Sequence, residues 1–167
     1  TEKYGVVHPT KAGLKIPEIF DAAINKEVKA LWIIGEDVVQ TDPNSAHVAQ
    51  AMNALDLLVV QEIFLSETAK HADVVLPGTT FLEKDGTFTN TERRVQRVNK
   101  AAEPLPGTKP DGVIVTEMMQ KLGYNQPTYD ADQVLEEIAD IVPFFKGITR
   151  ERLGKLGLQW PVKEDGT

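Results

Sequence analysis

The hydrophobic pattern of the first half of the chain predicts three strands joined by helical segments. Continuous apolar runs at Ala30–Ile34 and Leu57–Val60 have the length and the branched side chains of strands buried on both faces. A third run, Val74–Leu76, ends at Pro77-Gly78. Helical segments between the runs make a βαβαβ unit, whose crossovers are almost always right-handed. We therefore expect a parallel sheet with the carboxyl ends of all three strands at one edge.

Three helical segments are expected around these strands. Ile16–Ile24 has helical apolar spacing and leads into the first strand. Asp42-Pro43 is a helix-start signal, with Asp42 as the N-cap and Pro43 at the first helical position. Ser66–Ala69 opens a short segment that leads into the third strand.

The second half of the chain has a different pattern. Between Thr79 and Val98, the turn signal Lys84–Thr87 and a short alternation predict a small hairpin or an extended excursion. Glu103–Pro110 has the composition of a linker, and Asp130 with Gln133 resembles a capping box. Two or three helices are then predicted, over Val113–Leu122 and Val134–Ile141, with Thr149–Leu156 as the third candidate. The fold class expected is α/β: a three-layer, mostly parallel doubly wound sheet with a small hairpin excursion and C-terminal helices, in one domain over residues 1–167.

Composition narrows the chemistry that this chain can carry. The 167 residues include no cysteine, which excludes disulfides, thiolate metal or iron–sulfur sites and a cysteine nucleophile. His8, His47 and His71 lie on separate elements without metal-ligand spacing, so no metal site is assigned. The net charge of −7 makes nucleic acid and anionic membranes poor partners.

The ends of the chain suggest a piece of something larger. No apolar run approaches the length of a membrane span, and Thr1–Gly5 lacks a leader pattern, so we expect a soluble, cytoplasmic protein. The chain begins without Met and ends in the polar stretch Lys163–Thr167, which resembles a link between domains. We therefore expect an internal fragment of a longer subunit.

Polar residues and glycines follow each predicted strand. Ligands of open parallel sheets bind outside the carboxyl ends of the strands. Asp37 is an acceptor suited to ribose hydroxyls or to the N–H edge of guanine, and Gln61 can donate and accept. Gly35 and Gly78 would let the backbone approach a ligand closely. Alternatively, Asp37 caps the following turn, Gln61 is a strand-end side chain and both glycines serve turns.

The sequence lacks two common nucleotide-binding motifs and contains one basic cluster. Neither G-x-G-x-x-G after a strand nor G-x-x-x-x-G-K occurs, which disfavours a standard NAD or ATP site. A basic cluster is either a solvated face or a surface that meets a phosphate or an acidic domain. Its members are Arg93, Arg94, Arg97 and Lys100.

Four stretches of the chain carry a family resemblance. They are Ala30–Asp37, Val59–Pro77, Glu83–Arg94 and Gly157–Pro161. In order and spacing they resemble the molybdenum and tungsten bis-pterin oxidoreductases, and the Leu-Gln-Trp-Pro ending favours the catalytic (alpha) subunits of formate dehydrogenases among them. The resemblance covers nearly all of the chain.

The resemblance implies a domain that cradles a molybdopterin guanine dinucleotide. By this resemblance, the guanosine end would be lined by Gly35, Glu36, Asp37 and Thr41. The base or ribose would be contacted by Gln61, and the main chain of Gly78 would lie near the cofactor.

The same resemblance places the chemistry elsewhere in the protein. The family's iron–sulfur cysteine motif, its Cys or selenocysteine metal ligand and its catalytic His-Arg pair lie outside these residues, so no catalytic residue is assigned and the isolated segment is expected to be inactive. The whole enzyme would oxidise formate to carbon dioxide at molybdenum or tungsten, and pass electrons to an iron–sulfur subunit. The alternatives are a pterin-free structural domain of the large iron–sulfur subunit of NADH dehydrogenase, and a nitrate reductase.

Overall fold

The computed structural model describes residues 3–7 and 9–163. His8 and residues 164–167 of the polar ending lie outside the described residues. The chain forms two compact units, Thr1–Val75 and Leu76–Thr167. That both belong to one cofactor-binding domain stays a prediction. Within the described residues, no helix combines the length and the apolar character needed to cross a membrane.

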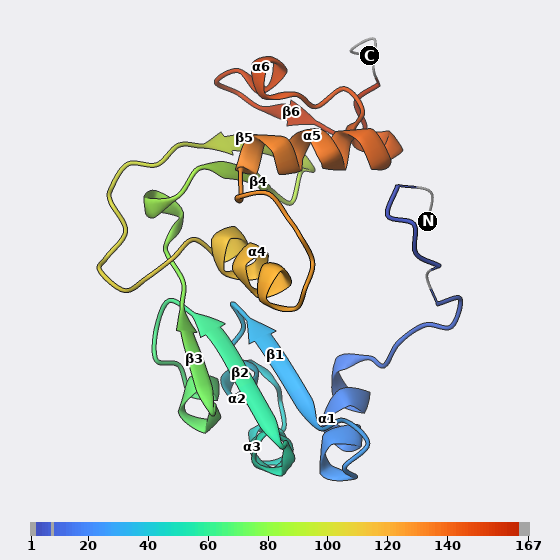
Figure 1. Ribbon diagram of the computed structural model, residues 1–167, viewed down its shortest axis with the longest axis vertical. Helices are drawn as coiled ribbons and strands as arrows, with labels where there is room; N and C mark the ends of the chain where they lie inside the picture. Colours follow the sequence, from blue (N-terminus) through green and yellow to red (C-terminus); the bar gives the residue numbers. More distant parts are fainter. Residues whose placement is uncertain (1–2, 8, 164–167) are drawn as a thin grey trace. The chain divides into compact units, whose positions relative to one another are not determined.

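A parallel sheet begins in the first unit, and its last strand runs two residues past the end of that unit (Figure 1). Its strands β1 (Ala30–Ile34), β2 (Leu57–Glu62) and β3 (Val74–Pro77) lie in the order β1-β2-β3. β1 and β2 pair in parallel from Ala30 opposite Leu57 to Ile34 opposite Gln61. The predicted α/β fold with a parallel three-stranded sheet is therefore confirmed.

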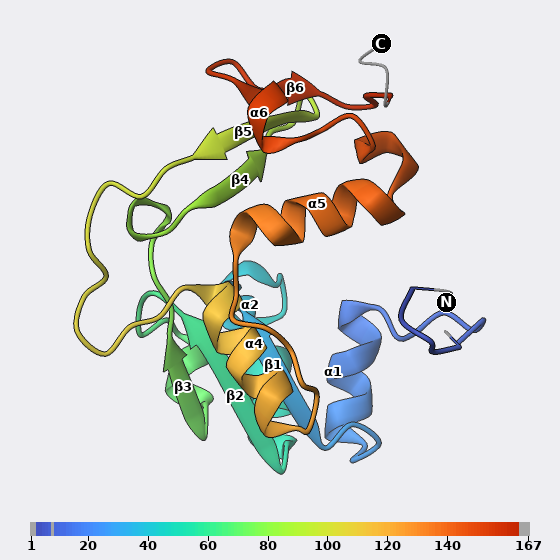
Figure 2. The same cartoon turned by 45° about the horizontal axis from the view of Figure 1, so that its top comes forward.

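Alternation along the strands decides which side chains face the helices. Leu31, Ile33, Leu58 and Val60 point to one face, as the two-residue period of a strand requires. They pack there with buried residues of α1 (Ile16–Ile24), α2 (Val38–Thr41) and α3 (Ser45–Ala54). These residues are Phe20, Ala23, Val38, Val48, Ala51 and Met52. Figure 2 shows α1 beside β1.

The predicted start of the middle helix is wrong. α3 begins at Ser45, and its N-cap is Asn44, whose side-chain oxygen accepts a hydrogen bond from the amide of His47 at 3.3 Å. Asp42 instead has extended backbone (ψ 136°) and ends α2. The reason is steric, because the ring of Pro43 disfavours helical backbone at the residue before it. The Asp42 carboxylate accepts from the amide of Asn44 at 2.9 Å, and so shapes the turn.

The second unit contains the predicted hairpin. Strands β4 (Gly86–Thr89) and β5 (Arg94–Val98) are antiparallel, and the short β6 (Leu158–Gln159) pairs with the other side of β5. The turn signal Lys84–Thr87 does not form the hairpin turn. Lys84 ends a 3₁₀ helix, η2 (Phe81–Glu83), and the hairpin turn lies between Thr89 and Arg94.

Three helices complete the second unit, as predicted. They are α4 (Asp111–Lys121), α5 (Ala131–Ile141) and α6 (Arg150–Leu153), with the 3₁₀ turn η3 (Pro143–Phe145) after α5. Asp130 caps α5 by accepting from the amides of its first turn, which confirms the predicted cap. α6 is shorter than expected because Gly154, with φ +51°, ends it. A small core joins α5 and α6 to β5 through Val95, Leu135, Ile148, Leu153 and Val162.

Candidate functional site

The carboxyl ends of β1 and β2 meet at one edge of the sheet in the first unit. The amide of Gly35 donates to the carbonyl of Gln61 at 2.9 Å, which extends the ladder by one residue beyond β1. Gly35 then turns the chain with φ +64°, a conformation that costs glycine little and other residues more. The turn directs Glu36 and Asp37 away from the strand.

Glu36 and Thr41 form an exposed polar pair at this edge. The Thr41 hydroxyl donates to Glu36 Oε1 at 2.8 Å, and both residues are solvent-exposed. The pair closes the loop that carries α2, since Glu36 precedes that helix and Thr41 is its last residue. The second carboxylate oxygen of Glu36 can accept from a ligand hydroxyl or N–H.

Asp37 anchors the loop after β2. Its Oδ1 accepts from the amide of Thr68 at 2.9 Å and from the Thr68 hydroxyl at 2.6 Å. Its Oδ2 accepts from the amide of Glu67 at 3.3 Å. The carboxylate thus caps the short helix η1 (Thr68–His71), although it makes no side-chain cap on its own helix α2. The sequence analysis offered Asp37 as a cap of the turn that follows it. In the structure Asp37 is a cap, but of η1.

Thr68 links the two strand-end loops and was not identified from the sequence. Its side chain is fully buried, and its hydroxyl oxygen also accepts from the amide of Val39 at 3.0 Å. Thr68 therefore bridges Asp37 and the start of α2. The available signal was a threonine at a helix start, which sequence patterns associate with caps but not with a distant carboxylate.

The surroundings of Asp37 shift its pKa downward. Partial burial acts in the opposite direction, since removal from water raises the pKa of a carboxyl group. The hydrogen bonds from Thr68 and Glu67, together with the charge of Lys70, outweigh that effect and lower the pKa below its ordinary value of 3.8. The carboxylate is consequently ionised at neutral pH.

This shift predicts a pH dependence of stability. Because the folded-state pKa is depressed, ionised Asp37 stabilises the fold above pH 3.8, and the contribution is lost as the pH falls through the folded-state pKa. The free energies of unfolding of wild type and Asp37→Asn should therefore differ most at pH values well above 3.8, and the difference should shrink as the pH falls through the lowered folded-state pKa of Asp37. Urea titrations of both proteins across this range provide the measurement. A constant difference at every pH would contradict the assignment.

The other two predicted site residues have different surroundings. Gln61 belongs to the last residue pair of the β1–β2 ladder, opposite Ile34. It is 0% exposed, so its side chain is not open to solvent. Gly78 follows β3 at the start of the second unit and is buried, in an isolated parallel bridge to Lys109. The structure therefore brings together Gly35, Glu36, Asp37, Thr41 and Gln61. The ligand contacts expected of Gln61 and Gly78 remain predictions.

The described residues of this edge do not form a metal-binding group. Among residues 3–7 and 9–163, no group of three or more His, Asp or Glu side chains could hold a metal ion. What the edge offers is exposed carboxylate and hydroxyl oxygens beside a turned backbone, which suits a polar organic ligand.

Comparison with known proteins identifies the family of this fold and site. The model of the molybdopterin oxidoreductase family matches residues 7–121, which include both strand-end loops. The chain belongs to the molybdopterin oxidoreductase family. The match covers β1, β2, β3 and the hairpin.

Relatives within this family are similar over nearly all of the chain. The alpha subunit of F420-dependent formate dehydrogenase 1 from Methanococcus maripaludis is 45% identical over 97% of the chain. The corresponding subunit of Methanocaldococcus jannaschii is 46% identical over 92%. A probable oxidoreductase of Bacillus subtilis is 44% identical over 98%. The chain covers 25%, 23% and 17% of these three proteins, and so spans a quarter of their length or less.

A solved structure shares the fold. Acetylene hydratase from Pelobacter acetylenicus superposes with a TM-score of 0.69 over 87% of this chain and 20% of its own, at 21% identity. At this identity the likeness concerns the fold alone.

Proposed function

We propose that this chain is part of the pterin-binding region of a formate dehydrogenase alpha subunit. The edge formed by Gly35, Glu36, Asp37 and Thr41 would hold the guanosine end of a molybdopterin guanine dinucleotide. The single observation that carries the proposal is the exposed Glu36–Thr41 pair beside Gly35 at the carboxyl end of a parallel strand, in a chain of this family.

The donor and acceptor chemistry of this edge fits guanosine. Ribose offers two hydroxyl donors, and the Watson–Crick edge of guanine offers N–H donors. An ionised carboxylate accepts both kinds of hydrogen bond, and charge-assisted bonds of this kind are stronger than neutral ones. Glu36 presents such a carboxylate to solvent, and among the described residues it accepts a hydrogen bond from the hydroxyl of Thr41.

Asp37 takes a positioning part in this proposal. Its two oxygens already accept from Thr68 and Glu67, so its main effect is to hold the loop that presents Glu36. Gln61 and Gly78 would add contacts to the base or ribose and from the main chain, respectively. Both would do so in the longer protein, where other domains complete the site.

The whole protein would catalyse the oxidation of formate to carbon dioxide. When bound, the pterin cofactor supplies molybdenum or tungsten as the redox centre, and an iron–sulfur cluster elsewhere in the longer chain accepts the electrons. Partners would be the remaining domains, an iron–sulfur electron-transfer subunit and formate, in the cytoplasm. Support comes from the names of the relatives, two of which are formate dehydrogenase alpha subunits. The structural-domain and nitrate reductase alternatives are not favoured.

The proposal is tested in the longer polypeptide that contains this chain. Purified subunit should contain pterin, guanine and molybdenum or tungsten. It should reduce an oxidised dye with formate as the electron donor, and it should not oxidise the reduced dye with nitrate as the electron acceptor. A polypeptide that contains neither pterin nor metal after expression in a host that makes the cofactor would overturn the proposal. Cofactor content is a separate readout from turnover, so a failure of cofactor binding is distinguishable from a different substrate.

Replacing Glu36 by glutamine should weaken nucleotide binding without altering stability. The amide keeps the size of the side chain but loses the charge, so the affinity of the chain for guanosine 5′-diphosphate should fall about tenfold. The free energy of unfolding should change by less than about 0.5 kcal/mol, because Glu36 is exposed. Calorimetric titration with the nucleotide measures the first, and urea unfolding the second. Unchanged affinity would remove Glu36 from the site.

A further inference from the structure

The C-terminal part of the second unit concentrates positive charge in an acidic chain. Basic residues outnumber acidic ones in the segments 92–100 and 146–163, although the chain as a whole carries a net charge of −7. The acidic residues in these segments are Glu92 and Glu151. The basic residues are Arg93, Arg94, Arg97, Lys100, Lys146, Arg150, Arg152, Lys155 and Lys163.

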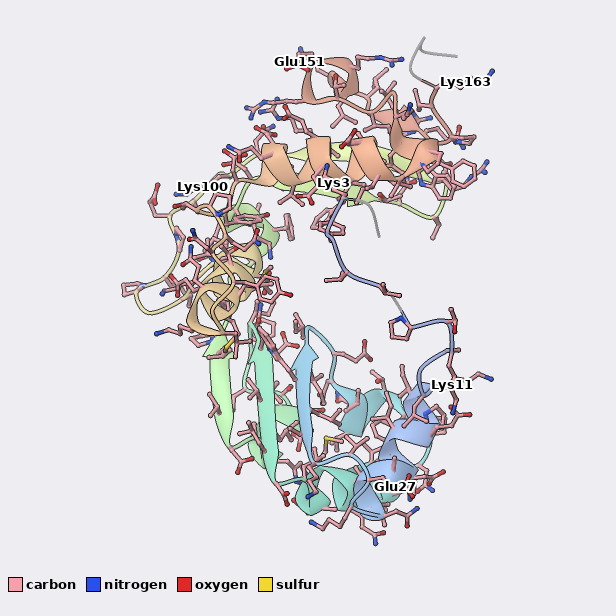
Figure 3. All side chains as sticks on the ribbon, turned by 45° about the vertical axis from the view of Figure 1, so that its right-hand side comes forward. Lys3, Lys11, Glu27, Lys100, Glu151 and Lys163 are labelled. Carbon is pink, nitrogen blue, oxygen red and sulfur yellow. The ribbon has the colours of Figure 1, made fainter. Side chains whose placement is uncertain are left out.

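The fold joins these two segments, which are far apart in the sequence. β5 pairs with β6, as Arg94 lies opposite Gln159 and Val95 opposite Leu158. Gly157 packs so closely on β5 that a Cβ there would lie 2.3 Å from the carbonyl oxygen of Val95. Arg97 on β5 and Arg150 on α6 line one open groove of about 390 Å³. Figure 3 labels Glu151 on α6 and Lys163 at the end of the described chain.

Several of these cations form no close ion pair with an acidic residue in the described part of the chain, although the charge of Arg97 does act on Glu151. Arg94 approaches Glu92 at 4.0 Å, and Arg150 pairs with Asp132. By contrast, four cations form no ion pair within 4.0 Å among the described residues. They are Arg93, Arg97, Arg152 and Lys155, which are termed here the unpaired basic cluster.

Two members of the cluster are held in place by neighbouring side chains. The guanidinium of Arg93 lies over the indole of Trp160, 5.4 Å from the ring centre, and Trp160 is itself stacked on Phe145. Arg97 Nε donates to Asn99 Oδ1 at 2.8 Å, which leaves its terminal N–H groups for a partner. A guanidinium that is already oriented loses less conformational freedom when it binds a carboxylate.

We propose that the unpaired basic cluster is a docking surface for an acidic segment of another polypeptide. The cations are exposed or half-buried and are spread over the hairpin turn, β5, α6 and the turn after α6, which suits an extended partner rather than one small anion. Glu151 lines the groove with Arg97 and Arg150, and its carboxylate interacts with both guanidinium groups. It would repel any anion there, so the cations outside the groove, Arg93, Arg152 and Lys155, provide most of the attraction. Charge complementarity therefore favours a polypeptide whose clustered Asp and Glu side chains can avoid Glu151.

This surface is independent of the proposed nucleotide site. It uses residues of the second unit, whereas the Glu36–Thr41 pair belongs to the first. Loss of nucleotide binding would thus leave the docking proposal standing, and the reverse also holds.

A decaglutamate peptide with a fluorescent label tests the proposal on the full chain. Fluorescence anisotropy at low salt should show binding that weakens as salt is added, whereas decaglutamine should not bind. The variant Arg93→Gln/Arg97→Gln/Lys155→Gln should bind the acidic peptide about tenfold more weakly, since three exposed charge pairs are removed. Circular dichroism and urea unfolding of each variant check that the fold is retained.

A charge-matched variant supplies the control. Lys11→Gln/Lys29→Gln/Lys121→Gln removes the same charge from exposed lysines elsewhere, and its affinity for decaglutamate should fall less than about twofold. Equal weakening by both variants would show that net charge alone attracts the peptide, and would overturn the proposal. Displacement of the peptide by inorganic phosphate at equal ionic strength would instead assign a phosphate site. Concentration-dependent self-association blocked by the first variant would assign the surface to a second copy of the chain, which also overturns it.

Discussion

Replacing Gly157 by alanine is expected to destabilise the second unit by about 3 kcal/mol. Two costs combine at this position. Gly157 has φ +72°, which other residues rarely adopt, and a Cβ would lie 2.3 Å from the carbonyl oxygen of Val95. That oxygen belongs to the β5 backbone, so relief requires the β5–β6 pairing to open. Urea unfolding followed by tryptophan fluorescence measures the change, since Trp160 lies three residues away.

Gly123→Ala is the matched control for this prediction. Gly123 also has a positive φ, of +91°, but a Cβ there would meet no atom within 4 Å. Its substitution should therefore cost only about 1 kcal/mol, from the backbone conformation alone. Equal effects of the two substitutions would contradict the tight contact between Gly157 and the β5 backbone.

Asp37→Ala is expected to lower the free energy of unfolding by about 2–3 kcal/mol. The substitution leaves the amides of Glu67 and Thr68 without their acceptor, and it leaves the buried Thr68 hydroxyl without the carboxylate to which it donates. Loss of an acceptor from buried donors costs more than the hydrogen bonds themselves contribute. Chemical denaturation of the full chain gives the value.

Glu36→Ala is the comparison for Asp37→Ala. Glu36 adjoins Asp37 but is exposed and accepts one hydrogen bond from Thr41, so its loss should cost less than about 0.5 kcal/mol. If the two substitutions destabilised the chain equally, the distinction between Asp37 as the anchor and Glu36 as the ligand contact would be wrong.

Sequence patterns predicted the strands and most helices of the fold correctly. The run Ala30–Ile34 matches β1 at both ends. A short apolar run bounded by a charged residue, Lys29, and a turn residue, Gly35, is typical of a buried strand. The start of α3 was misplaced because Asp42-Pro43 and Asn44 offer competing caps. The choice depends on the backbone that Pro43 imposes on Asp42, which periodicity does not report.

The site was predictable only in part, for reasons of distance along the chain. Gly35, Glu36 and Asp37 are adjacent in the sequence, and the parallel pairing of β1 with β2 places them at one edge. The bond between Asp37 and Thr68 spans 31 residues and depends on how the loop after β2 folds back. The burial of Gln61 likewise depends on what packs over the end of β2, and its side-chain type alone does not indicate it.

The location of the nucleotide site is open to one direct measurement. Guanosine 5′-diphosphate titrated into the ¹⁵N-labelled chain should shift amide resonances of Gly35, Glu36, Asp37 and Thr41 more than those of the second unit, and adenosine 5′-diphosphate should shift them less. Shifts that cluster elsewhere in the chain, or none at millimolar nucleotide, would contradict the assignment of the β1 edge to the guanosine end of the cofactor.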